Sequence, residues 1–175
     1  MSAAMLLLLP LNWLLAAATA AFFHEICHYF ALRLCGVPIF RIRIRGSGAI
    51  IDTAPMSLRQ EFYCALAGPL GGLILLLFFR QIPRIAICAA TQSLFNLLPL
   101  YPMDGGRALR CVAYRLMPKK AELCMVWTAR LCLGGILVLG LIATFRYHLG
   151  LLPLILFFVL CIRSKCEKSL AMRSS

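Results

Sequence analysis

The sequence predicts an all-α polytopic membrane protein with about five transmembrane helices and a short β-hairpin at the membrane surface. Hydrophobic residues make up 62% of the 175-residue chain and charged residues only 14%, whereas soluble globular domains carry about 45–50% apolar residues. The apolar residues gather in long stretches, and Lys and Arg fall between them. At this length we expect a single membrane-embedded domain over residues 1–175.

A transmembrane helix needs about 20 mainly apolar residues, and five stretches meet or approach that length. They cover residues 6–34, 62–79, 85–100, 121–145 and 149–162. Gly36 and Pro38 are expected to end the first helix, because neither residue continues a helix well.

The positions of Lys and Arg test this division without using hydropathy. Most of them follow the first, third and fifth stretches, whereas the opposite side holds only Arg80, Arg84 and Arg146. By the positive-inside rule the N-terminus lies outside and the C-terminus lies in the cytoplasm. The net charge of +12 then follows from topology, and we expect no nucleic-acid partner.

Residues 38–54 are predicted to form a hairpin at the cytoplasmic membrane surface. Apolar and basic side chains alternate with a period of two, and a Gly-Ser-Gly turn follows, which is typical of a strand with one apolar and one basic face. Two interpretations stay open. The basic residues could contact anionic lipid, at about 1 kcal/mol each, or the edge strand could receive an extended peptide.

The sharpest motif is His24-Glu25-Ile26-Cys27-His28, near the middle of the first stretch. Positions i and i+4 share a helix face, so His24 and His28 can present two imidazoles to one metal ion. A zinc ion there would lower the pKa of its water, and Glu25 would take the proton as general base. The alternative, a solvated charged face, is disfavoured because charged residues in lipid are costly.

Two His and a water leave tetrahedral zinc one ligand short. Among the six acidic residues, Asp104 follows a segment rich in Pro and Gly that should break the third helix. Non-helical backbone at membrane depth is tolerated only where it is buried in protein or lines a water-filled cavity. A carboxylate at such a break is well placed to be the third ligand. The alternative is a helix N-cap paired with Arg107. Asn96, two turns earlier, could contact a substrate backbone or a neighbouring helix.

The Ala65–Gly72 segment of the second stretch is rich in small residues. Small residues let helices approach closely, so we interpret this segment as a helix-packing surface.

Taken together, HEICH in one span, AGP in the next and NLLPLYPMDGG after the third resemble the site-2 protease family of intramembrane zinc metalloproteases. The motifs cover roughly residues 20–107. The compact form looks most like the branch of the bacterial stage IV sporulation protease, without a PDZ insertion or a C-terminal regulatory domain. Met103 replaces the usual Leu before Asp104, a volume-conserving change.

The resemblance implies a function for each motif residue. His24, His28 and Asp104 would hold one Zn²⁺ per chain, Glu25 would be the general base, and Asn96 would lie near the scissile peptide. The implied activity is regulated intramembrane proteolysis of a transmembrane or membrane-associated protein. The implied location is the bacterial cytoplasmic membrane, with anionic lipid at the cytoplasmic face.

Two other functions fit the same residues. A catalytically silent membrane protein could keep the zinc site for binding a client helix or as a scaffold. A metal transporter is a third class, but it would carry acidic residues along several spans, and the sequence has no such array. Imidazole and carboxylate ligands also suit other divalent ions.

Overall fold

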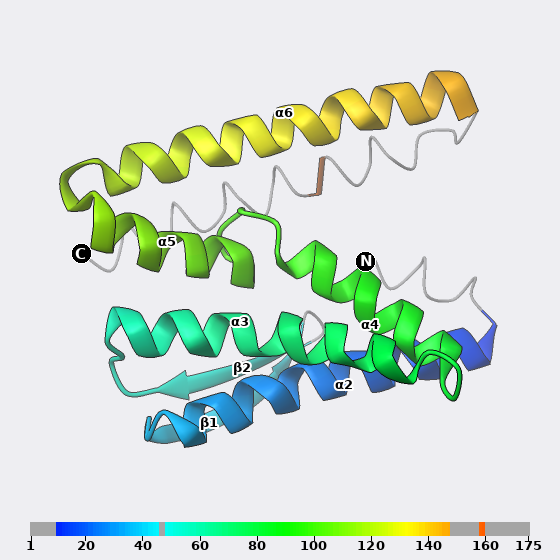
Figure 1. The fold of residues 1–175 in the computed structure, drawn as a ribbon, viewed down its shortest axis with the longest axis horizontal. Coiled ribbons are helices and arrows are strands. Elements are labelled where there is room, and N and C mark those ends of the chain that lie inside the picture. The colour runs from blue at the N-terminus through cyan, green and yellow to red at the C-terminus, as the bar shows by residue number, and fades with distance from the viewer. Residues whose placement is uncertain (1–9, 46–47, 148–157, 160–175) are drawn as a thin grey trace. The chain divides into compact units, whose positions relative to one another are not determined.

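The computed structural model describes residues 10–45, 48–147 and 158–159. In this part of the chain five α-helices, two short 3₁₀ helices and one two-stranded sheet follow in sequence (Figure 1). Their order is α2 (Leu11–Leu34), β1 (Ile39–Arg45), β2 (Gly48–Thr53), α3 (Leu58–Ile74), η1 (Leu75–Phe78), α4 (Pro83–Asn96), α5 (Asp104–Leu116), η2 (Pro118–Lys120) and α6 (Ala121–Tyr147). The chain divides into two compact units, residues 1–97 and 98–175.

Three helices are long and apolar enough to cross a membrane: Leu11–Leu34, Leu58–Phe78 and Pro118–Arg146. They correspond to the first, second and fourth predicted spans. The predicted fold class, helical and polytopic with a small hairpin, is therefore confirmed. The fifth predicted span, 149–162, lies outside the described residues except for 158–159, and the single-domain assignment stays a prediction.

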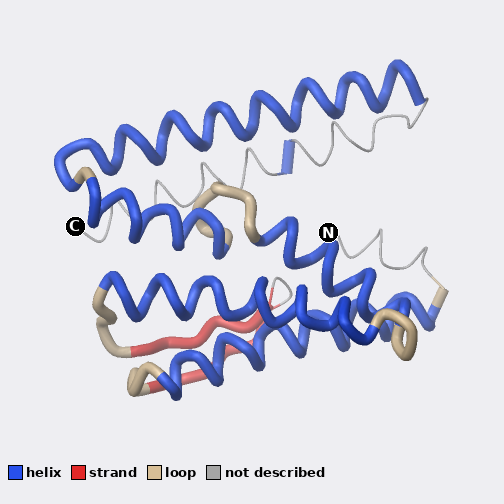
Figure 2. The backbone as a smooth tube through the Cα atoms, in the orientation of Figure 1, coloured by secondary structure: helices blue, strands red, loops and turns tan. Residues whose placement is uncertain are grey.

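The first unit is built on mutual contacts among α2, α3 and α4, with β2 lying against α2 (Figure 2). α2 begins after Pro10 and ends at Leu34, with Cys35 as its C-cap, followed by Gly36 with a φ of 67°. A positive φ is easily adopted by glycine, so the predicted helix end is confirmed and has a local cause.

The hairpin forms where the alternating pattern placed it, and its strands are antiparallel. Arg43 Nη2 donates a hydrogen bond of 2.7 Å to Asp52 Oδ1 across the strands. This ion pair is a diagonal contact, two positions out of direct register, since Arg43 lies opposite Ile50 and Asp52 lies opposite Arg41.

α3 begins at Leu58, four residues before the predicted start of the second span. Ser57 and Gln60 form a capping box: Ser57 Oγ accepts from the Gln60 amide at 3.3 Å, and Gln60 Oε1 accepts from the Ser57 amide at 3.0 Å. The cap satisfies two amides of the first turn. Hydropathy marks where apolar residues begin, whereas the cap marks where the helix begins.

The structure corrects the third predicted span, 85–100. α4 ends at Asn96 and has 14 residues, which corresponds to about 21 Å and is shorter than the roughly 30 Å hydrocarbon core. The chain then runs without helix through Leu97–Met103, with a cis peptide bond between Tyr101 and Pro102. The helix break expected before Asp104 is present, and it begins earlier than predicted.

α5 was not among the predicted helices, because its residues were interpreted only as a basic segment after the third span. It is strongly amphipathic: Ala108 and Cys111 are buried and lie on one face at i and i+3. In the second unit α5 contacts α6, and Arg110 lies over the Tyr101 ring at 5.8 Å. The i, i+3 spacing of Ala108 and Cys111 in the sequence is the signal that could have revealed α5.

Gly72→Ala should lower the free energy of unfolding by about 1–3 kcal/mol. A Cβ at Gly72 would lie 2.2 Å from Ser93 Oγ and 3.2 Å from the Ala89 carbonyl oxygen, so α3 and α4 would have to separate. Thermal unfolding in detergent, followed by helical circular dichroism, measures the loss.

Ser93→Ala provides the control for this contact. Ser93 Oγ is buried and has no hydrogen-bond partner among the described residues, so its removal should cost little. The double variant should recover most of the stability lost in Gly72→Ala. A double variant as unstable as Gly72→Ala would contradict the packing described here.

Candidate metal centre

His24 and His28 form a pair of facing imidazoles on α2. Their ring centroids are 4.7 Å apart and their Nε2 atoms 3.1 Å apart. His24 is 4% exposed and His28 is half-buried. The i, i+4 spacing therefore does what the sequence predicted, bringing two metal-binding nitrogens to one point.

The pair lies near the middle of a helix of membrane-spanning length. His24 is about 20 Å along the axis from Leu11 and about 15 Å from Leu34. Glu25 is half-buried and follows His24 by about 100° around the helix, so it lies on the flank of the same face. The three motif residues thus share one side of α2.

A backbone carbonyl from α3 orients His28. His28 Nδ1 lies 2.7 Å from the Cys64 carbonyl oxygen, which can only accept a hydrogen bond, so Nδ1 carries the proton and donates. In a neutral imidazole the other nitrogen, Nε2, then keeps its lone pair. This arrangement is the one that metal-binding histidines use, with one nitrogen held by the protein and the other facing the ion.

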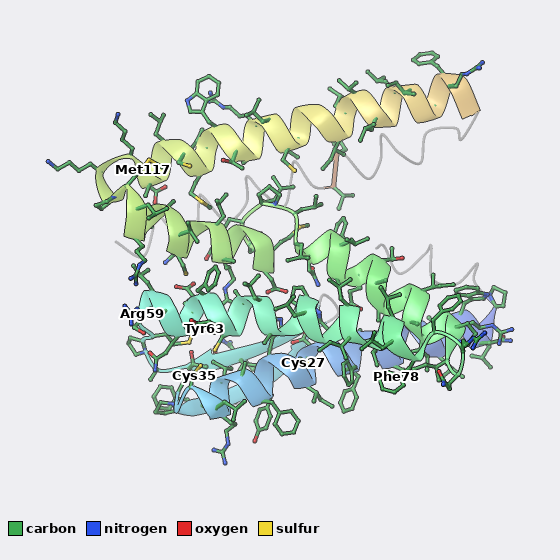
Figure 3. The ribbon with its side chains drawn as sticks, viewed as in Figure 1. Cys27, Cys35, Arg59, Tyr63, Phe78 and Met117 are labelled. Carbon is green, nitrogen blue, oxygen red and sulfur yellow. The ribbon has the colours of Figure 1, made fainter. Side chains whose placement is uncertain are left out.

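Gly68 of α3 makes room for both imidazoles. A Cβ at this position would lie 2.3 Å from His28 Nε2 and 2.8 Å from His24 Cε1. The next turn repeats this close approach, because a Cβ at Gly71 would lie 2.2 Å from Cys27 Sγ. Figure 3 shows Cys27 on α2 between the two helices. The small-residue segment is a packing surface, as predicted, and part of what it packs against is the histidine pair.

Asn96 lies beside the same pair although it is distant in sequence. It is the last residue of α4, and its Nδ2 atom is 3.2 Å from His24 Nε2. The first unit therefore brings together His24, His28 and Asn96. The part Asn96 plays toward a substrate stays a prediction.

Asp104 belongs to the second unit, where it is the first residue of α5 and half-buried. Gly106 lets this first turn pack tightly, because a Cβ there would lie 2.4 Å from the Leu100 carbonyl carbon and 2.5 Å from the Tyr101 amide nitrogen. The carboxylate is thus presented from the start of a helix that rests on the preceding turn. Its role as third ligand stays a prediction.

The donor set of the first unit fits zinc. Two imidazole nitrogens bound to one tetrahedral zinc lie about 3.3 Å apart, given Zn–N distances of about 2.0–2.1 Å, and the two Nε2 atoms are 3.1 Å apart. The absence of a side chain at Gly68 lets both imidazoles occupy this position, where a Cβ would lie 2.3 Å from His28 Nε2. The Cys64 carbonyl was not among the predicted site groups, since no pattern of residue types reveals a backbone acceptor.

Comparison with known proteins gives the fold and one relative. No protein-family model matches the chain. A zinc metalloprotease of Methanocaldococcus jannaschii is 33% identical over 103 residues, which cover 51% of this chain and only 30% of the length of that relative. The solved structure of the site-2 protease from Methanocaldococcus jannaschii matches with a TM-score of 0.59 and 22% identity, covering 87% of this chain and 77% of that one.

The relative and the solved structure agree with the motifs on different grounds. The relative is similar in sequence over about half of the chain, and the solved structure is similar in fold over most of it. The printed name of the relative and the fold of the solved site-2 protease both agree with the resemblance that the motifs carry.

Proposed function

We propose that the chain is an intramembrane zinc metalloendopeptidase that cleaves a transmembrane or membrane-associated protein in regulated intramembrane proteolysis. One observation carries the proposal: two imidazoles face each other at the middle of a helix long enough to span a membrane, with His28 fixed by the Cys64 carbonyl. Polar groups of this kind are costly in lipid and usually serve a function. The relative named as a zinc metalloprotease supports the reaction class.

In this proposal His24, His28 and Asp104 hold one zinc ion. Two imidazoles and one carboxylate leave a fourth position open, as in catalytic zinc sites. When bound, zinc acts as a Lewis acid and makes its water more acidic. The chain orients the ligands: Cys64 fixes His28, and Gly68 lets both rings approach α3.

Glu25 is proposed as the general base, because it lies on the flank of the histidine face and a carboxylate there can take a proton from water and return it to the leaving amine. Asn96 is proposed to bind the substrate backbone. Its amide group offers both a donor and an acceptor, and it already lies 3.2 Å from His24 Nε2.

The remaining proposals concern the setting of the enzyme. The N-terminus would lie outside and the C-terminus in the cytoplasm, with the protein in the bacterial cytoplasmic membrane. The hairpin would lie at the cytoplasmic surface, where Arg41 and Arg43, both exposed, would contact anionic lipid. Its edge would be available to an extended segment of a membrane-protein substrate.

Glu25→Gln should keep the metal and lower the cleavage rate by about 10²–10⁴, because the amide cannot accept the proton. The rate is measured on tagged single-span membrane proteins co-expressed with each variant. Glu61→Gln, the same change in the first turn of α3, serves as the control and should cleave normally. Undiminished cleavage by Glu25→Gln would show that Glu25 is not the general base. Full complementation by the Glu25→Gln variant would favour the catalytically silent binding protein.

Asp104→Ala should lower zinc affinity by at least about tenfold, since second-sphere partners of metal ligands alone contribute 10- to 100-fold. Metal analysis of the purified protein and competition with a chelator give the affinity. Asp52→Ala removes a carboxylate that pairs with Arg43 in the hairpin and should leave zinc bound. Equal zinc content in both variants would show that Asp104 is not a ligand.

Gly68→Ala should weaken zinc binding by at least about tenfold, because the new Cβ would lie 2.3 Å from His28 Nε2 and displace the ring. Gly134→Ala in α6 is the matched control, since a Cβ there meets nothing within 4 Å. The same metal analysis distinguishes them. Zinc retention by Gly68→Ala at the wild-type level would contradict the close approach of α3 to the imidazoles.

A further inference from the structure

The corner where α5 meets α6, residues 114–123, is rich in exposed positive charge. Arg115, Lys119 and Lys120 are exposed, and the one acidic residue of the corner, Glu122, accepts a hydrogen bond from the Tyr114 hydroxyl. The hydrogen bond to Glu122 raises the pKa of Tyr114, with burial adding to the effect. The phenol therefore stays protonated and keeps Glu122 engaged beside α5.

The same corner exposes large apolar side chains. Leu116 is 70% exposed, Leu123 is 57% exposed, and Met117 lies at the turn that joins the two helices (Figure 3). Exposed apolar and basic side chains at one place are typical of a segment in the membrane interface, where the apolar parts enter the acyl region and the charges stay with the headgroups.

The position of the corner in the chain agrees with such an interface. It contains the start of the membrane-length segment Pro118–Arg146, so it lies at the end of a span. Trp127 follows Leu123 by one turn on the same helix face and is 54% exposed. Arg130 lies over the Trp127 ring at 5.6 Å. Both residues lie inside the span, so Trp127 would meet the acyl chains, and the long side chain of Arg130 would carry its charge toward the headgroups.

We infer that the α5–α6 corner binds an anionic phospholipid of the bilayer. Lys119, Lys120 and Arg115 would contact the phosphate and the anionic headgroup, and Leu123 and Trp127 would contact the acyl chains. Charge complementarity favours this occupant, because the corner holds three exposed cations and one carboxylate, which is already hydrogen-bonded. The site is separate from the histidine pair and does not depend on zinc chemistry.

Quenching of Trp127 by brominated lipid tests the inference directly. The chain has two tryptophans, so Trp13→Phe leaves Trp127 as the single emitter. The full-length protein is reconstituted in phosphatidylcholine mixed with phosphatidylglycerol, with bromine on the acyl chains of one lipid at a time. At equal mole fraction brominated phosphatidylglycerol should quench more strongly, and high salt should reduce the difference.

Paired variants assign the preference to the corner. Lys119→Gln with Lys120→Gln should lower the preference for phosphatidylglycerol by about fivefold per lysine, whereas Lys119→Arg with Lys120→Arg should keep it. Arg80→Gln with Arg84→Gln removes the same charge from exposed positions just before α4 and in its first turn and should leave Trp127 quenching unchanged. Circular dichroism checks that the variants keep their helices.

Three results would overturn the inference. Equal quenching by the two brominated lipids would show that the corner has no preference for anionic headgroups. A preference that survives the glutamine substitutions would place the lipid elsewhere. Loss of the preference on adding inorganic phosphate, but not on adding chloride at the same ionic strength, would indicate a site for free phosphate.

Discussion

The close approach of α3 to α2 at Gly68 is the constraint on which the histidine pair depends. The space beside the Gly68 backbone is filled by the edges of both imidazoles, and the Cys64 carbonyl, one turn earlier, accepts from His28 Nδ1. Between helices in lipid there is little hydrophobic driving force, so association relies on close packing and hydrogen bonds. The Gly68 contact supplies the close packing, and the Cys64 carbonyl supplies the hydrogen bond.

The same stretch of α3 also positions α4. Gly71 faces Cys27 of α2, and Gly72 faces Ser93 of α4, so neighbouring glycines hold two different helices at short distance. α4 then ends at Asn96, whose amide lies beside His24. The three glycine contacts of α3 are therefore coupled to the site: the packing that brings α4 onto α3 also brings an amide group to the histidines.

Burial gives this arrangement its chemical consequence. His24 is 4% exposed, and the neighbouring His28 donates from Nδ1 to the Cys64 carbonyl oxygen. A neutral imidazole held in this way keeps a lone pair at its other nitrogen for a cation. For the proposed hydrolase, a site screened from bulk water would also strengthen the electrostatic interactions that activate the attacking water.

Local sequence patterns predicted a large part of the fold, and their failures have identifiable causes. Hydropathy located the membrane-length helices, and alternation located the hairpin strands, because both signals are local. Hydropathy did not locate the start of α3, which a Ser57 and Gln60 capping box sets. It also extended the third span past Asn96, since the apolar Leu97–Leu100 segment continues the composition of α4 without continuing its helix.

By itself the sequence determined the membrane class of the protein, the spacing that puts His24 and His28 on one helix face, and the break before Asp104. These features follow from composition and from the fixed geometry of a helix. Only the tertiary structure decided that the Cys64 carbonyl orients His28, that Gly68 accommodates both rings and that Asn96 reaches His24. Such contacts join residues far apart in the chain, and they depend on how closely the helices pack, which no local periodicity specifies.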